Sequence, residues 1–302
     1  GKKVYLLSLF FLLISCTKKN QEEKSASLAY GSAKKNVFEY YRSSDPKSLD
    51  PQAQLDSVSG SFVQSIYDTL VSYHYLKRPY QLEPTLLEKM PFLSKDGKKL
   101  TFQLRKGVYF HDNSCFPGGK GRELISDDVI YTLKRFADIN INTQSWFLLN
   151  DVIVGLDSFR KKTEKNTKVN YKKSSVLGLE KIDRYQFSLQ LKRKNPLILY
   201  ALASPSLSIV PREAVEKYGR FFGRNPVGTG AYQLTQYRKK QTMVLTKNPN
   251  YFLKYPSHGE EKDLRSGLLK DANQTLPLID QVEIHYIPEP QPRMLKFKKG
   301  EL

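Results

Sequence analysis

The sequence predicts a mixed α/β fold, because short segments with alternating apolar residues are followed by segments with helical periodicity. The clearest case is residues 99–135. Within it, residues 100–104 alternate apolar and polar side chains, as in a half-buried strand. The turn residues Lys106 and Gly107 then predict a hairpin whose second strand covers residues 108–111.

A helix is predicted directly after a Gly-rich loop in the same stretch. Ser126 is the expected N-cap, and Asp127 and Asp128 suit the positive end of the helix dipole. The apolar positions then recur at helical spacing, at Val129, Ile130, Leu133, Phe136 and Ala137. This strand, turn and helix pattern needs no catalytic group.

Further elements follow from the same two periodicities. We expect strands at residues 37–41 and 208–210, helices at 62–70 and 197–203, and a hairpin at 176–191, and two more strands in 232–252. A length of 302 residues with 39% hydrophobic content is enough for two ordinary domains with real cores.

The charge balance is strongly basic, with 49 Lys and Arg against 30 Asp and Glu and a formal net charge of +19. Such a balance raises the question of a nucleic-acid or anionic partner. The basic residues are scattered, however, and the densest cluster, residues 160–173, has few apolar residues. We therefore interpret it as a solvated loop, with a functional anion-binding surface as the alternative, and expect no nucleic-acid partner.

The N-terminus has the features of an export signal. Lys2 and Lys3 precede an apolar run at residues 4–14, which is too short to span a bilayer, since a spanning helix needs about 20 residues. The sequence "LISC" that ends at Cys16 resembles a bacterial lipobox. We expect residues 1–16 to be a lipoprotein signal peptide with lipidation at Cys16, and polar residues 17–36 to be a flexible tether. An ordinary secretory signal with an incidental Cys is the alternative.

No enzymatic or metal-binding pattern stands out. The sequence lacks H-E-x-x-H and G-x-S-x-G, and its four His are widely spaced. The Gly-rich residues 115–122 depart from a phosphate-binding loop because no Ser or Thr opens a helix after Lys120. Cys115 with His111 gives only two metal ligands, which do not close a zinc site. We expect no enzyme activity, no cofactor and no metal site, with a secreted enzyme kept as a lesser alternative.

Several segments, in this order, resemble the family 5 extracellular solute-binding proteins, the peptide- and nickel-type receptors of ABC importers. They are "LDP" at residues 49–51, "LRKGVYFHD" at 104–112, "SDDVIYTLKR" at 126–135, "VIVGLDSF" at 152–159, "GTGAY" at 228–232, "NPNYF" at 248–252 and "IDQVEIHYIPE" at 279–289. The resemblance covers nearly the whole chain but only the first part of the family fold.

The resemblance implies an α/β fold of the periplasmic-binding-protein type, type II and of the peptide-binding class. Residues 37–71 and 174–290 would form lobe I, and residues 72–173 a smaller α+β domain inserted in it. Residues 291–302 would begin the crossover to a second lobe, which is missing from this chain.

The resemblance also points to ligand-binding residues. The loop after "LDP" faces the ligand cleft in the family, so Asp56, Ser57, Val58 and Ser59 are candidates. Trp146, the only Trp, is either a core residue or an aromatic platform for ligand side chains.

The function implied is that of the substrate-binding component of an ABC importer, which captures a peptide or similar small solute and delivers it to the permease subunits. The protein would be exported and held on the periplasmic or cell-surface side of a membrane by its lipid anchor. A surface lipoprotein with the same fold but a structural or adhesive role is the alternative.

Overall fold

The computed structural model describes residues 36–53, 56–141, 143–166 and 169–300. Residues 35–302 form one compact unit. The expected signal peptide, its lipidation site Cys16 and nearly all of the expected tether lie outside the described residues, so these remain predictions. Within the described ranges, no helix has the length and apolar character that crossing a membrane requires.

Strands and helices alternate along the chain, as expected for a mixed α/β protein. The strands are β1 (Val37–Arg42), β2 (Val71–Tyr73), β3 (Leu82–Pro84), β4 (Phe92–Leu93), β5 (Lys99–Gln103), β6 (Leu179–Lys181), β7 (Gln186–Gln190), β8 (Tyr232–Arg238), β9 (Thr242–Lys247) and β10 (Gln281–Tyr286). The α-helices are α1 (Ser57–Ile66), α2 (Ser126–Ala137), α3 (Leu156–Glu164), α4 (Ile198–Leu202), α5 (Arg212–Tyr218), α6 (Glu261–Arg265) and α7 (Pro290–Lys298). Short 3-10 turns include η3 (Trp146–Leu148) and η4 (Pro205–Leu207).

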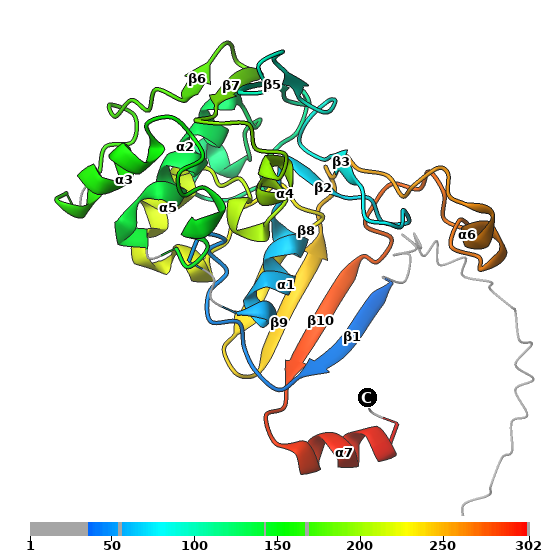
Figure 1. Cartoon of the computed structure of the whole chain (residues 1–302). Coiled ribbons are helices and arrows are strands. Elements are labelled where there is room, and N and C mark those ends of the chain that lie inside the picture. The colour runs from blue at the N-terminus through cyan, green and yellow to red at the C-terminus, as the bar shows by residue number, and fades with distance from the viewer. Residues whose placement is uncertain (1–35, 54–55, 142, 167–168, 301–302) are drawn as a thin grey trace, which may run out of the picture. The chain divides into compact units, whose positions relative to one another are not determined.

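The first sheet has the strand order β1-β10-β9-β8 and joins the two ends of the described chain. β1 and β10 are parallel, with Val37 opposite Gln281, whereas the other pairs are antiparallel. α1 lies against one face of this sheet (Figure 1). On that face Ile284 and Met243 are fully buried in the same core cluster as Phe62 of α1.

The second sheet has the order β4-β5-β7-β6 and lies beside α2 (Figure 1). Phe102 of β5 is opposite Phe187 of β7, and their rings stack with centroids 4.7 Å apart. Both rings are fully buried. A stacked and buried aromatic pair of this kind is a major contribution to the core, because each ring removes a large apolar area from water.

The "GTGAY" segment, which leads into β8, packs against the end of α1. A Cβ on Gly228 would lie 2.2 Å from the Ile66 carbonyl oxygen, and one on Gly230 would lie 2.4 Å from the Ile66 carbonyl carbon. Only Gly permits this close backbone approach, in which the Gly230 amide donates to the Ile66 carbonyl at 2.9 Å. The two Gly therefore serve packing and not dinucleotide binding.

The expected hairpin at residues 106–107 is wrong. Gly107 does turn the chain, with φ at +75°, but β5 pairs with β4 on one side and β7 on the other. No edge of β5 remains for a following strand. The chain after the turn forms only an isolated bridge, between Tyr109 and Glu123.

Three further expectations need correction. Ser126 is not the N-cap of α2; it is the first helical residue, and the Asp128 carboxylate accepts from the Ile125 amide at 2.9 Å. The helix expected at 62–70 is α1, which starts earlier and ends at Ile66 because Tyr67 is extended. Residues 208–210 are buried but form no strand, since the Ile209 amide donates instead to the Asp68 carbonyl.

The expected elements at 37–41, 176–191 and 197–203 are confirmed as β1, the β6–β7 hairpin and α4. β8 and β9 confirm the two strands expected within residues 232–252. The division into lobe I and an inserted domain stays a prediction. A boundary between residues 173 and 174 would separate β5 from β7, which are paired strands of one sheet.

Candidate functional site

The two parallel strands of the first sheet end beside a groove. In open α/β sheets, ligands bind beyond the carboxyl ends of parallel strands, which here are Arg42 of β1 and Tyr286 of β10. A cavity of about 800 Å³ lies at this end, within the size range of ligand pockets. Its lining residues are Ser43, Ser44, Asp45, Pro46, Lys47, Leu49, Gly223, Arg224, Asn225, Tyr237, Lys239, Lys240, Tyr286 and Pro288.

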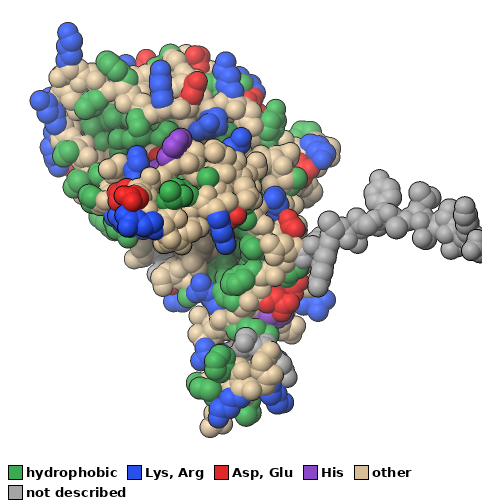
Figure 2. Space-filling model, turned by 90° about the vertical axis from the view of Figure 1, so that its right-hand side faces the viewer, with side chains coloured by type: hydrophobic (Ala, Val, Ile, Leu, Met, Phe, Trp, Pro, Cys, Tyr) green, Lys and Arg blue, Asp and Glu red, His purple; other side chains and the backbone are tan. Residues whose placement is uncertain are grey.

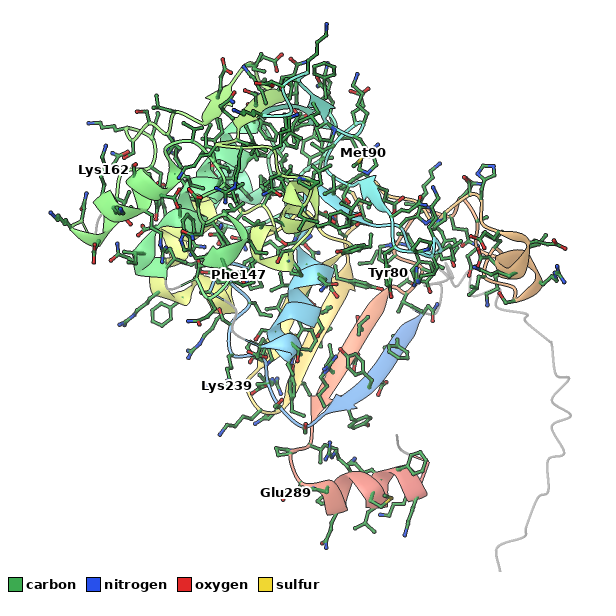
Figure 3. The ribbon with its side chains drawn as sticks, in the orientation of Figure 1. Tyr80, Met90, Phe147, Lys162, Lys239 and Glu289 are labelled. Carbon is green, nitrogen blue, oxygen red and sulfur yellow. The ribbon has the colours of Figure 1, made fainter. Side chains whose placement is uncertain are left out.

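The groove lies where the chain enters α7. Lys239, in the β8–β9 turn, and Glu289, just before α7, mark this region of the molecule (Figure 3). α7 has no buried residue among those described. Pro288 of the groove lining lies two residues before the start of α7.

Buried hydrogen bonds fix the "LDP" segment, whose Leu49 lines the groove. The Arg135 guanidinium of α2 donates two hydrogen bonds to the Asp50 carboxylate, at 2.8 and 2.6 Å, and another to the Gln52 side chain. Gln52 in turn donates to the Thr132 carbonyl at 2.8 Å. Because Asp50 and Arg135 are both buried, this pair holds the loop rigidly against α2.

The four candidate residues 56–59 form the start of α1, and two of them have a structural role. The Asp56 carboxylate caps the helix, accepting from the Ser59 amide at 2.9 Å and from its hydroxyl at 2.8 Å. The buried Ser59 hydroxyl oxygen accepts from the Lys47 amide at 2.9 Å, which ties α1 to the groove wall. Ser57 is exposed, and Val58 packs partly against the core.

Trp146 lies apart from these four residues. Its half-buried ring lies 6.2 Å from Phe136 of α2 and beneath the Arg160 guanidinium at 4.7 Å. Among the described residues, the structure shows no hydrogen bond, ion pair or ring contact between Trp146 and residues 56–59. Trp146 thus lies at the edge of the hydrophobic core. A role for Trp146 as a platform for ligand side chains remains a proposal.

The groove lining carries more positive than negative charge. Lys47, Arg224, Lys239 and Lys240 are all exposed, and Asp45 is the one carboxylate in the described lining. The Asp45 Oδ2 accepts from the Lys240 amide at 2.6 Å, whereas its buried Oδ1 has no hydrogen-bond partner among the described residues. Such a lining favours an anionic group of a ligand, since charge-assisted hydrogen bonds to carboxylates are strong.

Tyr237 also lines the groove, between the basic side chains and Asp45. Burial, reinforced by the nearby Asp45 carboxylate, raises the pKa of the Tyr237 hydroxyl to about 12. The hydroxyl is thus neutral at physiological pH and can donate or accept a hydrogen bond.

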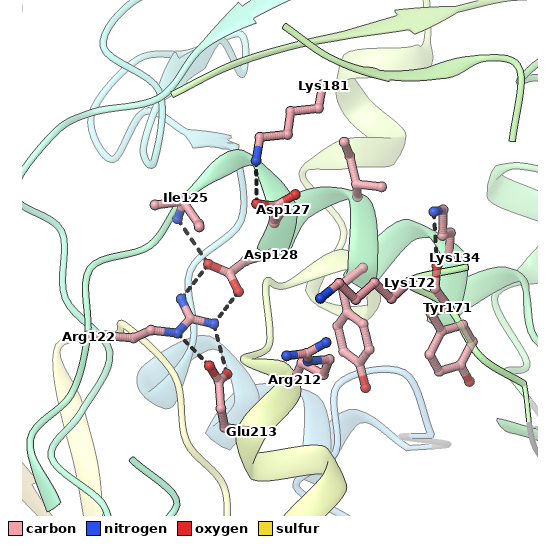
Figure 4. A pocket seen from close by; sticks show the side chains of 12 residues that line it. Arg122, Ile125, Asp127, Asp128, Lys134, Tyr171, Lys172, Lys181, Arg212 and Glu213 are labelled. Atoms are coloured by element: carbon pink, nitrogen blue, oxygen red, sulfur yellow. Dashed lines mark hydrogen bonds and ion pairs between the residues drawn. The ribbon is translucent and has the colours of Figure 1, made fainter. Parts of the chain in front are cut away.

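A second concavity, of about 450 Å³, lies against α2 (Figure 4). Its central feature is Arg122, which donates to both oxygens of Asp128, at 2.8 and 2.6 Å, and to both oxygens of Glu213, at 2.7 and 2.8 Å. Both carboxylates are already paired with one guanidinium. We therefore assign this concavity to the scaffold that joins α2 to α5.

A third concavity, of about 330 Å³, lies beside the end of α1. The buried Asp68 carboxylate in its wall accepts from the Thr229 hydroxyl at 2.8 Å and from the Tyr251 hydroxyl at 3.1 Å. Burial raises the pKa of Asp68 to about 6, although both hydrogen bonds act in the opposite direction. These contacts join two of the family-like segments, "GTGAY" and "NPNYF", to α1.

The fold belongs to a class of solute-binding proteins. Residues 81–302 match the model of the bacterial extracellular solute-binding proteins, family 5. This match covers well over half of the chain, and the chain belongs to that family.

Its curated relatives include receptors named for peptides and for heme. The chain is 28% identical over 213 residues to the periplasmic oligopeptide-binding protein OppA of Salmonella typhimurium, covering 69% of this chain and 35% of that protein. It is 26% identical over 254 residues to heme-binding protein A of Haemophilus influenzae, covering 82% and 43%. The chain thus spans less than half the length of either relative.

Solved structures share the fold. DppA from Helicobacter pylori, in complex with the peptide STSA, matches with a TM-score of 0.65 and 24% identity over 88% of this chain and 45% of that one. OppAIV from Borrelia burgdorferi matches with a TM-score of 0.68 and 21% identity over 89% and 46%. The α/β fold of the periplasmic-binding-protein type is therefore confirmed, for a chain that corresponds to about 45% of these structures.

None of the residues that line the groove was among the candidates from the sequence. Asp45 and Tyr286 are about 240 residues apart in the sequence, and Tyr237 lies between them. Only strand pairing brings these three residues together. One signal was present: Lys239 and Lys240 occupy the turn between two predicted strands. The sequence did not reveal that this turn lies beside the end of β1.

Proposed function

We propose that this chain is part of the substrate-binding component of an ABC importer, which captures a peptide or similar small solute and delivers it to the permease. The observation that carries the proposal is the open groove at the carboxyl ends of β1 and β10 in a member of solute-binding family 5. The relatives named for oligopeptides support a peptide as the solute.

The basic lining suggests which end of a peptide the groove receives. Lys47 and Lys239 extend into solvent beside the polar Tyr237, so a carboxylate placed there gains charge-assisted hydrogen bonds. We propose that the groove binds the carboxylate of a peptide or an acidic side chain. Asp56, Ser57, Val58, Ser59 and Trp146, which lie outside the groove lining, are proposed as further contacts of the ligand.

One wall gives weak binding by itself. Receptors with two lobes gain affinity by closing on the ligand and burying most of its surface. The present groove is open, so we expect this chain to bind a peptide much more weakly than a longer protein that includes a second lobe.

The test is a thermal-shift screen of a peptide library with this chain and with the longer protein. A ligand at 100 times its Kd stabilises the folded state by about 2.7 kcal/mol, which is readily detected. The double variant Lys47→Ala/Lys239→Ala should weaken binding of a selected peptide to the longer protein by at least about tenfold, which corresponds to about 1.4 kcal/mol.

The matched control is Lys161→Ala/Lys162→Ala, which removes two exposed lysines from α3, distant from Lys239 (Figure 3). It should leave affinity unchanged. Equal weakening by both double variants would show that net charge, and not the groove, governs binding. Failure of the longer protein to bind any peptide would favour the structural or adhesive role.

Lipid anchoring at Cys16 is a separate part of the proposal. The support is the short apolar run that ends in "LISC". Cys16→Ser should move the protein from the membrane fraction to the soluble exported fraction. A Cys16→Ser protein that stays with the membrane would contradict the anchor.

A further inference from the structure

The outer face of the first sheet, opposite α1, is polar. Along β10, Ile284 and Tyr286 are buried, whereas the alternating residues Glu283 and His285 are only partly buried. A strand exposes alternate side chains on opposite faces, so Glu283 and His285 share the outer face. There they line a shallow groove of about 490 Å³ with residues of β8 and β9.

Strand pairing adds a second carboxylate to this face. β1 is parallel to β10, with Glu39 directly opposite Glu283 and Tyr41 opposite His285. The His285 Nε2 lies 3.5 Å from a Glu39 carboxylate oxygen and 4.0 Å from one of Glu283. One ligand atom from each of these three residues lies within 4.8 Å of the other two.

Arg238 lines the same shallow groove, but within the described residues it forms no ion pair with either carboxylate. Among the described residues, neither Glu39 nor Glu283 forms an ion pair with a Lys or Arg, although such residues number 49 in the chain. The Gln281 side-chain amide donates to a Glu283 carboxylate oxygen at 2.5 Å. Like charges directly opposite each other in a sheet are destabilising, so a cation bound between Glu39 and Glu283 would stabilise the sheet.

His285 presents a nitrogen to the two carboxylates. Its Nε2 is shielded from solvent and has no hydrogen-bond partner within the described residues. The ring is held by Tyr41, whose centroid lies 5.0 Å away. A buried and unsatisfied ring nitrogen costs free energy unless it binds a proton partner or a metal.

The spacing suits a metal ion. Zinc binds His nitrogen and carboxylate oxygen at about 2.0–2.2 Å, so tetrahedral ligand atoms lie roughly 3.4 Å apart. The observed separations of 3.5 and 4.0 Å are close to this value and need only small side-chain rotations. One imidazole with two carboxylates favours zinc and similar transition metals over calcium and magnesium, which prefer oxygen ligands.

We propose that Glu39, Glu283 and His285 form a surface site for a divalent transition metal of the zinc type. With three protein ligands, a four-coordinate zinc would keep one further position for water or for a ligand from a second molecule. This site is distinct from the groove at the carboxyl ends of β1 and β10, and it does not depend on the proposed transport function.

The test is isothermal titration of the chain with ZnCl₂, with MgCl₂ as the comparison. The chain carries no histidine tag, and Cys16 and Cys115 are replaced by Ser so that thiols cannot bind the metal. We expect one zinc ion per chain and no magnesium binding. His285→Ala and Glu283→Gln should each weaken zinc binding by at least about tenfold, which is the lower end of what ligand-sphere changes produce.

The control variant is His258→Ala, which removes an exposed His distant in sequence from the site. It should bind zinc as the parent chain does. Glu283→Gln is nearly isosteric and on a solvent-facing side, so its melting temperature without metal should stay within about 2 °C of the parent. Zinc should raise the melting temperature of the parent and the His258→Ala chain but not of Glu283→Gln.

Two results would overturn the proposal. One is the absence of stoichiometric zinc binding by the parent chain. The other is equal zinc affinity in the parent and His285→Ala chains, which would place the metal elsewhere.

Discussion

The charged groups around α2 are paired with one another, whereas those around the groove at the end of β1 are mostly exposed to water. At α2, Arg135 is buried against the carboxylate of Asp50, and Arg122 is paired with two carboxylates. At the groove, Lys47 and Lys239 are exposed, and one oxygen of Asp45 has no hydrogen-bond partner among the described residues.

The comparison shows which charged groups are available to a ligand. A buried charge is costly unless it is paired, so the groups at α2 are committed to the scaffold. The groove residues lie in water and can exchange water for ligand groups at lower cost. The shape of the groove thus depends on the buried hydrogen-bond network beside it, which fixes the "LDP" segment.

The largest effect should come from breaking that network. Arg135→Ala leaves the buried Asp50 carboxylate without its partner, and we expect a loss of about 3–5 kcal/mol in the free energy of unfolding. Denaturant-induced unfolding measures it. Removing one partner of a buried pair costs more than the pair itself contributes, because the remaining charge stays desolvated.

An exposed ion pair provides the control for this variant. Arg193 pairs with Asp151 at 2.6 Å, with side chains 68% and 50% exposed. Arg193→Ala should cost at most about 1 kcal/mol. Similar losses for the two variants would contradict the distinction between the buried network and the surface.

The next largest effect is a dependence of stability on pH through His111. Its buried ring contacts the carbonyl of Gly230 through Nε2 at 2.9 Å and accepts from the Gly228 amide through Nδ1 at 3.4 Å. Burial lowers the pKa of His111 from 6.5 to about 4. A neutral ring with its proton on Nε2 satisfies both contacts, whereas a protonated ring would turn a donor toward the Gly228 amide.

The sign of the effect follows from proton uptake. Between pH 4 and 6.5 the unfolded chain binds a proton at His111 that the folded chain does not, so stability is full above pH 6.5 and falls as pH decreases toward 4. The total is about 3 kcal/mol. Asp68, whose pKa is raised to about 6, acts in the opposite direction, because its contribution is lost as pH rises from 3.8 through 6.

The free energy of unfolding is measured for the parent and His111→Gln chains across pH 4–7. The difference between the two chains separates the contribution of His111 from that of Asp68. Asp68 is present in both chains, so it cancels in the difference. We expect the stability advantage of the parent to shrink as pH falls. A constant difference across this range would show that His111 titrates normally in the folded protein.

The smallest effect distinguishes a structural from a ligand-binding role for Asp56. Asp56→Ala removes the cap of α1 and should cost about 1 kcal/mol in unfolding free energy. Asp56→Asn keeps a capping oxygen but removes the charge, so its stability should match that of the parent. If Asp56 also contacts the solute, Asp56→Asn will weaken peptide binding without loss of stability; unchanged binding would confine Asp56 to the cap.

Local sequence patterns were sufficient for much of the fold. The alternation in residues 100–104 and the helical spacing after Ser126 predicted β5 and α2, because these signals depend on neighbours a few residues away. The family-like segments predicted the overall class. The hairpin after Gly107 failed for a non-local reason, since both edges of β5 were already occupied by β4 and β7.

The candidate site was harder to predict from the sequence than the fold was. Asp56 to Ser59 were expected in a loop, but a side-chain cap at Asp56 starts a helix there. His111 was expected in the second strand of a hairpin; it is instead outside any strand and only 4% exposed, because it packs against the "GTGAY" segment. The Asp56 cap is a local contact with Ser59, whereas the burial of His111 depends on the distant backbone groups of Gly228 and Gly230.

The sequence by itself determined the alternation of strands and helices, the family and the basic charge. The tertiary structure alone decided which residues meet: Asp45 with Tyr237 in the groove, and Glu39 with His285 on the outer face of the sheet. The physical reason is the parallel pairing of β1 with β10. Its register is set by backbone hydrogen bonds between segments at opposite ends of the described chain, and a shift by one residue would turn every side chain of β1 to the other face.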